Sequence, residues 1–180
     1  MGMMAEGVEA IEPRAARERV ARFLRCLQRW SSKINLTGAE TGAAAFDTLV
    51  RPVLGAEGLL RGRVVDVGSG NGSPALILAA LRPDLEFVLL EPRAKRWAFL
   101  REAVREMDLP NVTVERHRSD TYRGPLADTA TMRAVGLPPG ELRPLLAPGG
   151  CVLVFGGPEL PAAEAFRLPS GATVQRRCFT

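Results

Sequence analysis

The stretch Val64-Val65-Asp66-Val67-Gly68-Ser69-Gly70-Asn71-Gly72-Ser73-Pro74 decides the fold of this 180-residue chain. The apolar run at its start predicts a short buried strand, and Pro74 opens a helical segment that runs to Leu81. Glycines between a strand and a helix let the backbone turn tightly and approach a ligand, while free amides of the helix point into the cleft. The stretch therefore predicts a nucleotide-binding loop in a doubly wound fold.

Strands and helices alternate downstream of this loop. Apolar runs predict strands at 87–90, 112–115, 129–135 and 151–155, and helical spacing predicts helices at 95–107 and 141–146. Such alternation from residue 63 to residue 155 calls for a mostly parallel sheet with helices on both faces, which is an α/β fold of the Rossmann-like type. After it, residues 162–166 predict a turn of helix and residues 173–179 a closing strand.

The first 60 residues predict a helical extension. Residues 1–12 have no periodicity and indicate a frayed tail, and residues 31–45 indicate a loop before a short helical segment at 46–54. Between them, one helix face is apolar, at Val20, Phe23, Leu24, Leu27 and Trp30. Six arginines crowd the rest of this helix, at positions 14, 17, 19, 22, 25 and 29. Either a solvated face or a nucleic-acid-binding surface accounts for them.

Composition sets the limits for function. The net charge is +4, and 22 of the 24 basic residues are arginine, which favours an anionic partner weakly. No apolar run reaches the roughly 20 residues that span a bilayer, so no membrane role is expected. The three cysteines (Cys26, Cys151, Cys178) form no C-x-x-C pair, and the N-terminus has no apolar signal core, which favours a reducing cytoplasm. No repeat divides the chain, and we expect one structural domain with an extension (1–60) and a core (61–180).

The glycine spacing separates the candidate cofactors. The dinucleotide fingerprint G-x-G-x-x-G places its last glycine at residue 73, but this chain has Ser73 there and Gly72 one position earlier. The triphosphate-binding loop requires a lysine, and none occurs between Lys33 and Lys95. The pattern is G-x-G-x-G, which favours neither a dinucleotide nor ATP.

Two acids flank this loop, and the arrangement resembles the S-adenosylmethionine site of the Rossmann-like methyltransferases. Asp66 precedes the glycines, and Glu91 ends the next strand, where a carboxylate can accept both hydrogen bonds of a ribose diol. A helix N-cap beside Pro92 is the alternative for Glu91. Asp120 lies where that superfamily places an acid or amide near the adenine amino group, although a solvated loop acid fits as well. The resemblance implies cofactor contacts from Asp66, Gly68, Ser69, Gly70, Gly72, Glu91, Ser119 and Asp120.

A narrower resemblance rests on the strings at 30–37 and 65–74, which look like the bacterial glucose-inhibited division protein B family. Further matches follow in order, at 82–84, 89–91, 95–96, 99–100, 111–112, 118–120, 133–134 and 146–150. The similarity covers most of residues 20 to 158. That family methylates guanine N7 in small-subunit ribosomal RNA. It implies a cytoplasmic enzyme that needs no metal, acts on this RNA or the 30S subunit, and contacts its acceptor through Asn35, Thr37 and Arg133.

The chain also departs from that family. An Arg-His pair followed by Asp-Ser usually comes after Asn-Leu-Thr, whereas this chain has Leu49-Val50-Arg51-Pro52-Val53-Leu54. Strand five of the family ends in Lys-Gly, and Phe155-Gly156-Gly157 stands here instead. An impaired relative that binds the cofactor and serves as a ribosome-associated or regulatory module therefore remains an alternative, and a small-molecule methyltransferase is a third.

The chemistry of N7 methylation agrees with the residues present. Guanine N7 carries an in-plane lone pair, so the reaction needs alignment and desolvation rather than a general base. We expect His117 to be a partly exposed strand-end side chain and Cys151 to be a core residue rather than a nucleophile. Arg133 ends the fourth strand at the cleft, where its guanidinium can bind guanine O6 or a phosphate. It is the predicted catalytic residue and is not expected to be needed for cofactor binding.

Overall fold

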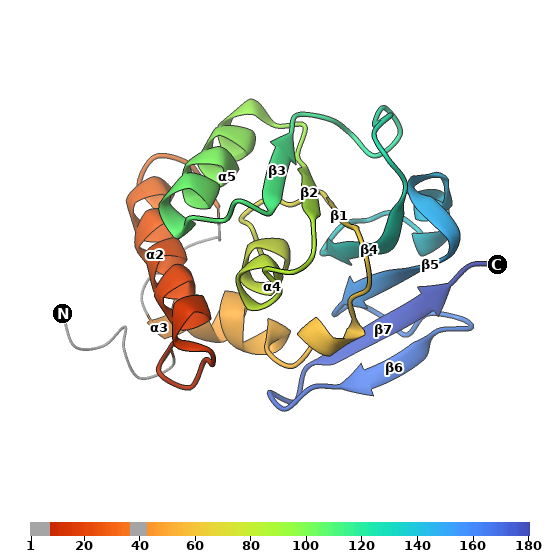
Figure 1. The fold of residues 1–180 in the computed structure, drawn as a ribbon, viewed down its shortest axis with the longest axis horizontal. Helices are drawn as coiled ribbons and strands as arrows, with labels where there is room; N and C mark the ends of the chain where they lie inside the picture. The colour runs from red at the N-terminus through yellow and green to blue at the C-terminus, as the bar shows by residue number, and fades with distance from the viewer. Residues whose placement is uncertain (1–7, 37–42) are drawn as a thin grey trace.

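The computed structural model describes residues 8–36 and 43–180 and has a seven-stranded sheet at its centre (Figure 1). The strands are β1 (Val64–Val67), β2 (Phe87–Leu90), β3 (Val112–Glu115), β4 (Ala127–Arg133), β5 (Leu146–Phe155), β6 (Glu164–Arg167) and β7 (Thr173–Cys178). Their order is β3-β2-β1-β4-β5-β7-β6, with β1 to β5 parallel and β7 antiparallel to both of its neighbours. The mostly parallel Rossmann-like fold is confirmed, and the strand order reverses between β1 and β4, where such sheets bind ligands.

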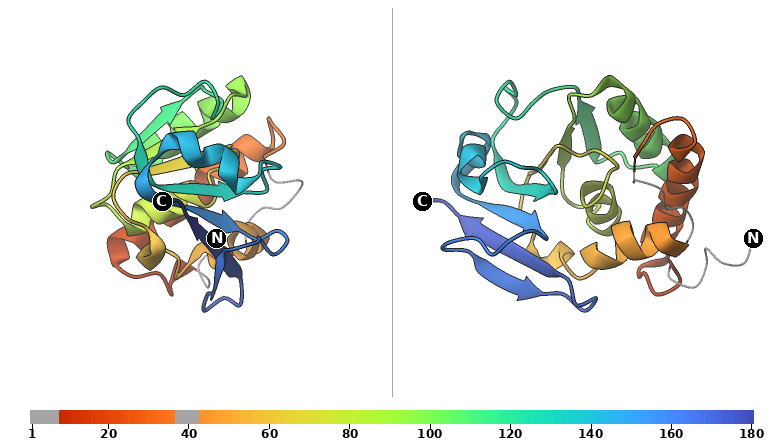
Figure 2. Two further views of the ribbon diagram at one scale, coloured as in Figure 1. Left: turned by 90° about the vertical axis from the view of Figure 1, so that its right-hand side faces the viewer. Right: turned by 180° about the vertical axis from the view of Figure 1, so that it is seen from behind.

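The longer helices cover one face of the sheet. The α-helices are α2 (Arg14–Ser31), α3 (Ala43–Ala45), α4 (Ala75–Leu81) and α5 (Ala94–Met107); a π-helix spans Phe46–Val50, and 3₁₀-helices span Arg51–Val53, Glu57–Leu59 and Pro139–Leu145. Helix α2 packs against α4 and α5, at the opposite end of the molecule from β6 and β7 (Figure 2). Val20, Phe23, Leu24 and Leu27 of its predicted apolar face are buried, and the partly buried Trp30 meets Phe99 edge-on with ring centroids 5.9 Å apart.

Side chains of each strand alternate between two hydrophobic layers. Phe87 and Leu89 join the layer under α2, α4 and α5, whereas Val88 and Leu90 face the other side. On that second side, the cover consists of the loop around Tyr122 and the 3₁₀-helix Pro139–Leu145. The predicted helix at 141–146 is a 3₁₀-helix that ends at Leu145, and Pro144 inside it has no N–H to donate to an α-helical hydrogen bond.

Three further segments differ from the sequence predictions, and one of them is α3, which lies within the predicted loop at 31–45. Residues 8–12 are not frayed, because Val8 and Ile11 are buried in the core; the rest of the predicted tail lies outside the described residues. The predicted helical turn at 162–166 is wrong, since β6 occupies 164–167 and pairs with β7. A single helical turn fixes the backbone dihedral angles of several residues and gains only one hydrogen bond. An edge strand forms a series of backbone hydrogen bonds with β7.

Two of the three widely spaced cysteines are paired, which the sequence did not predict. Cys151 on β5 lies opposite Cys178 on β7, and the two form a disulfide. The pairing follows from strand register, which a spacing of 27 residues along the chain does not reveal. Cys151 is buried as expected, but the inference of reducing surroundings from unpaired cysteines loses its support.

Candidate functional site

The glycine loop follows β1 and takes backbone conformations that other residues rarely adopt. Gly68, Gly70 and Gly72 have φ of 69°, 51° and 90°. A Cβ on Gly68 would lie 2.9 Å from Val135, and one on Gly72 would lie 2.6 Å from a core leucine, whereas at Gly70 the nearest atoms are 3.5 Å away. Packing therefore requires glycine at 72, and the open side of Gly70 is the one at which a ligand can approach the backbone.

Asp66 is a buried carboxylate close to this loop. Its side chain is 1% exposed, and its Oδ1 accepts a 2.6 Å hydrogen bond from the hydroxyl of Thr131 on the neighbouring strand. Its Oδ2 is buried and has no hydrogen-bond partner among the described residues. Burial, with a smaller contribution from the nearby Glu91 carboxylate, raises the pKa of Asp66 from 3.8 to about 6, although hydrogen bonds from Ser69 and Thr131 oppose the shift. An unsatisfied buried carboxylate oxygen strongly favours a cationic or donating ligand.

Glu91 links the glycine loop to the end of β2. It is 3% exposed; its Oε2 accepts from the Gly70 amide at 3.0 Å, and its Oε1 accepts from the Arg93 amide at 2.9 Å. The N-cap of α5 is Arg93, so the alternative interpretation of Glu91 as that cap is wrong. Each oxygen keeps a free lone pair for a ribose hydroxyl. Among residues 8–36 and 43–180, neither Asp66 nor Glu91 forms an ion pair.

Two adjoining hollows flank the loop and share Gly68. The larger, of about 310 Å³, is lined by the loop, the π-helix and two arginines: Leu36, Thr48, Leu49, Gly68, Ser69, Gly70, Asn71, Ser73, Arg96, Arg133 and Ala134. The smaller, of about 120 Å³, lies over the ends of β1 and β2 and is lined by Val67, Gly68, Leu90, Pro92, His117, Arg118, Ser119, Val135 and Leu137. Asp66 and Glu91 are not among the residues that line these two hollows; the two buried carboxylates lie behind the glycine loop that the hollows share. Ser119 faces the smaller hollow, whereas Asp120 is exposed and pairs with Arg118 at 3.3 Å.

Arg133 ends β4, and its side chain extends toward the larger hollow. Its Nη1 donates to the Ser73 hydroxyl at 2.7 Å, and its Nη2 donates to the Thr48 carbonyl at 2.6 Å. The Ser73 hydroxyl in turn donates to the Leu49 carbonyl at 2.7 Å. No carboxylate pairs with Arg133 in the described part of the chain, and burial lowers its pKa. The guanidinium thus connects the N-terminal extension to the glycine loop at the mouth of the cleft.

The remaining predicted acceptor contacts lie in the segment after α2. Asn35 is exposed, and Thr37 lies outside the described residues. The Leu36 carbonyl between them accepts a 3.4 Å hydrogen bond from Asn71 of the glycine loop, so this segment reaches the site. Sequence reasoning missed Asn71, Ser73 and Arg96 as site residues, although the first two lie inside the motif itself. Thr48 acts through its backbone carbonyl, which leaves no signal in the sequence.

Some arginines of α2 form ion pairs, and others are exposed to solvent. Arg14 pairs with Glu18 at 2.8 Å, and Arg29 pairs with Glu106 of α5. Arg22 and Arg25 are exposed on the outer surface of the helix. The two sequence interpretations, a solvated face and a surface that binds nucleic acid, both remain compatible with this arrangement.

Neither a metal-binding cluster nor a membrane-spanning helix is found among residues 8–36 and 43–180. No group of three or more His, Cys, Asp or Glu side chains is placed to hold a metal ion in that part of the chain. No helix among the same residues is long and apolar enough to cross a membrane.

Comparison with known proteins agrees with this geometry. A family model, GidB, described as rRNA small subunit methyltransferase G, matches residues 16–161. The chain is 36% identical over 161 residues to the ribosomal RNA small subunit methyltransferase G of Nitrosococcus oceani, covering 87% of this chain and 75% of that protein. It is 35% identical over 195 residues to the protein of the same name from Acidiphilium cryptum, covering 95% and 88%.

Solved structures share the fold at low sequence identity. A SAM-dependent methyltransferase from Aquifex aeolicus is 15% identical with a TM-score of 0.58, over 77% of this chain and 94% of that one. A Plasmodium falciparum methyltransferase, solved with S-adenosyl-L-homocysteine, is 16% identical with a TM-score of 0.57, over 100% and 96%. The architecture is therefore that of S-adenosylmethionine-dependent methyltransferases.

Proposed function

Because the chain belongs to the rRNA small subunit methyltransferase G family, we propose that it transfers the methyl group of S-adenosylmethionine to N7 of a guanine in small-subunit ribosomal RNA. The observation that carries the proposal is the pair of buried carboxylates, Asp66 and Glu91, which lie at the glycine loop without cationic partners in the described part of the chain. Such a site disfavours a diphosphate and favours a nucleoside that carries cationic groups.

The residues present fit S-adenosylmethionine. Glu91 would hold the ribose diol, the open face of Gly70 would contact the amino-acid chain, and the unsatisfied Oδ2 of Asp66 would favour its ammonium group. The same proposal includes Gly68, Ser69 and Gly72 as loop residues, and Ser119 and Asp120 on the adenine side. When bound, the cofactor supplies a sulfonium methyl group to which the N7 lone pair adds, with the C–S electrons staying on sulfur and no proton released.

The protein's part in the reaction is alignment and exclusion of water. Arg133 is the proposed catalytic residue: one of its donors would turn to O6 or to a phosphate of the acceptor while the others keep the contacts to Ser73 and Thr48. Asn35 and Thr37 are the further proposed acceptor contacts. Because N7 loses no proton, the proposed reaction does not require a general base.

The proposal also covers the domain organisation, the binding partner and the cellular location of the protein. Residues 1–60 form an extension and residues 61–180 the cofactor-binding core, within one structural domain. One buried cluster supports a single structural domain, because it joins Phe23 and Val50 of the extension to Leu76 and Phe99 of the core. The proposed partner is small-subunit ribosomal RNA or the 30S subunit, and the proposed place of action is the cytoplasm.

Binding and transfer can be tested separately. Calorimetry should detect S-adenosylmethionine binding, and radiolabelled cofactor should deliver methyl groups to small ribosomal subunits that lack the modification. Binding without transfer to any ribosomal RNA would refute the enzymatic proposal and favour the impaired relative that the missing Arg-His and Lys-Gly elements suggest. Absence of binding would refute the cofactor site itself.

A further inference from the structure

The disulfide between β5 and β7 joins one exposed cysteine to one buried cysteine. Cys178 is among the exposed residues of β7, whereas Cys151 on β5 is 2% exposed. A thiolate from solution can therefore approach the bond from the side of Cys178. Exchange of a disulfide begins with attack on one of its two sulfurs, and the other sulfur leaves as a thiolate. Here the leaving sulfur would be the buried one.

A guanidinium lies beside the buried sulfur. Nη2 of Arg61 is 3.1 Å from Sγ of Cys151, and Arg61 forms no ion pair within residues 8–36 and 43–180. A disulfide sulfur is a weak acceptor, but a thiolate in the same place would gain a charge-assisted hydrogen bond. A nearby cation lowers the pKa of a thiol, and a sulfur with a lower thiol pKa leaves faster. Arg61 therefore favours opening of the bond with Cys151 as the leaving group.

The third cysteine has the opposite environment. Cys26 on α2 is a buried free thiol, and burial raises its pKa to about 12. A thiol that stays protonated is a poor nucleophile, because the thiolate is the reactive form. Thiol chemistry of the folded protein is therefore expected at the Cys151–Cys178 pair, and Cys26 is an internal reference.

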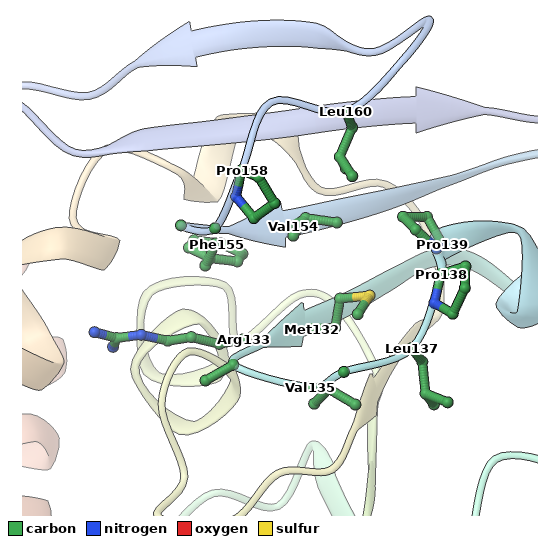
Figure 3. A pocket seen from close by; sticks show the side chains of 14 residues that line it. Met132, Arg133, Val135, Leu137, Pro138, Pro139, Val154, Phe155, Pro158 and Leu160 are labelled. Atoms are coloured by element: carbon green, nitrogen blue, oxygen red, sulfur yellow. The ribbon is translucent and has the colours of Figure 1, made fainter.

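The disulfide connects the last two strands covalently to the parallel part of the sheet. Strand β6 is the edge strand, and β7 joins it to β5 (Figure 1). Gln175 on β7 is 5% exposed; its Nε2 donates to the Pro158 carbonyl at 2.8 Å, and its Oε1 accepts from the Leu160 amide at 2.6 Å. Pro158 and Leu160 line a cavity of about 620 Å³ between the ends of β4 and β5 (Figure 3). A bond that restrains β7 therefore also restrains the loop after β5.

We propose that the Cys151–Cys178 bond is a thiol–disulfide exchange site for a low-molecular-weight thiol, and that its opening loosens the β6–β7 hairpin. In the first step, a thiolate RS⁻ attacks Sγ of Cys178. A bond from RS to Cys178 forms, the Cys151–Cys178 bond breaks, and its electron pair stays on Cys151 beside Arg61. In the second step, another thiolate attacks the RS sulfur, which releases RSSR and the Cys178 thiolate. The two external thiols lose two electrons, which the protein disulfide gains; the reverse sequence, with RSSR as the oxidant, closes the bond.

A bond that opens and closes is compatible with the proposed cytoplasmic location. Glutathione and thioredoxin keep most thiols reduced there, and the disulfides that do form are mainly transient and catalytic or redox-sensing. When the bond is open, hydrogen bonds to β5 and buried side chains such as Val174 still hold the hairpin, but without a covalent restraint. Thiol exchange does not depend on methyl transfer, so its failure would leave the proposed function intact.

Reduction kinetics of the folded full chain test the chemistry. The oxidised protein is mixed with 2-mercaptoethanol and quenched with acid at intervals, and mass spectrometry gives the state of each cysteine. The wild type should open through a mixed disulfide on Cys178, and Cys26 should carry no adduct. Arg61→Gln should open about tenfold more slowly, because the charge beside the leaving sulfur is lost. Arg167→Gln, at an exposed arginine of β6, is the control for loss of a charge and should match the wild type.

Three results of this experiment would each overturn the proposal. They are equal rates for wild type and Arg61→Gln, an adduct on Cys151 instead of Cys178, and a bond that opens only after the protein is unfolded with urea. Because Arg61 is exposed, its replacement leaves no buried group without a partner, and circular dichroism should confirm that both arginine variants are folded.

Amide hydrogen exchange tests the loosening of the hairpin. After reduction, the β7 amides that bond to β5 should exchange about a hundredfold faster, because no covalent bond then joins residues 27 apart in the chain. The amides of β2 in the interior of the sheet should be unaffected. Cys178→Ser should behave like the reduced protein with or without reductant, whereas the matched Cys26→Ala variant should respond to reductant as the wild type does. Equal exchange of β7 in the oxidised and reduced wild type would overturn the proposed loosening.

Discussion

Asp66→Asn should remove a pH-dependent instability that the cofactor site imposes on the protein. The folded-state pKa of about 6 lies above the ordinary value of 3.8, so the folded protein holds this proton more tightly than the unfolded chain does. The ionised carboxylate therefore destabilises the fold by about 3 kcal/mol near pH 7.5, and by about 1.6 kcal/mol near pH 5. Stability from this group rises as the pH falls through 6 toward 3.8, which is the sign expected for a raised carboxyl pKa. Asparagine keeps the acceptor for Thr131 and has no such proton.

Urea unfolding of both proteins across this pH range measures the effect. From about pH 7.5 to about pH 5, the wild type should gain about 1.4 kcal/mol of unfolding free energy relative to Asp66→Asn. Glu159→Gln, at an exposed carboxylate, is the control for loss of a charge and should follow the wild type. S-adenosylmethionine should bind the wild type more weakly below pH 6, and Asp66→Asn weakly at every pH. Parallel stability curves for wild type and Asp66→Asn would refute the assignment of a desolvated carboxylate to this site.

Three further predictions concern the loop, the acceptor and the RNA surface. Gly70→Val places a branched side chain on the open side of the loop at a φ of 51°, and calorimetry should detect no S-adenosylmethionine binding; wild-type affinity would move the cofactor site elsewhere. Arg133→Ala should lower methyl transfer to small-subunit RNA by about a hundredfold or more, from loss of on the order of 2 to 4 kcal/mol of transition-state stabilisation, while cofactor affinity falls much less, through the lost contact to Ser73 of the loop. Equal loss in both assays would assign Arg133 to the cofactor pocket. Affinity for ribosomal RNA should fall with rising salt, and Arg22→Glu with Arg25→Glu on α2 should reduce that slope while Arg167→Glu on β6 does not; a salt-independent interaction would exclude phosphate contacts.

Local sequence signals were sufficient for the central sheet and the glycine loop. Four-residue apolar runs, turn glycines and helical spacing each depend on neighbours in the chain, and the strands β1 to β5 formed where these signals lie. The positions of the two acids that flank the loop could also be predicted, because they follow from where the first two strands end. Asp66 and Glu91 are both buried there, although their cofactor contacts remain predictions.

Features that depend on contacts between residues far apart in the chain could not be predicted from the sequence. The Cys151–Cys178 disulfide needs the register between β5 and β7, and β6 exists because β7 supplies its hydrogen bonds. Burial of Val8 and Ile11 depends on apolar partners elsewhere in the core. The contacts of Arg133 were missed for the same reason, because the Thr48 carbonyl is a backbone group brought near by the π-helix.

Chemical mapping of N7-methylguanosine tests the central claim most directly. Small ribosomal subunits that lack the modification are incubated with the protein and S-adenosylmethionine, and the RNA is then reduced with borohydride and cleaved with aniline, which cuts at N7-methylated guanine. We predict a new cleavage site in small-subunit RNA that requires both protein and cofactor and does not appear with Gly70→Val. No cleavage, or methyl groups found on an exocyclic amine or a ribose hydroxyl instead, would contradict guanine-N7 methylation by this protein.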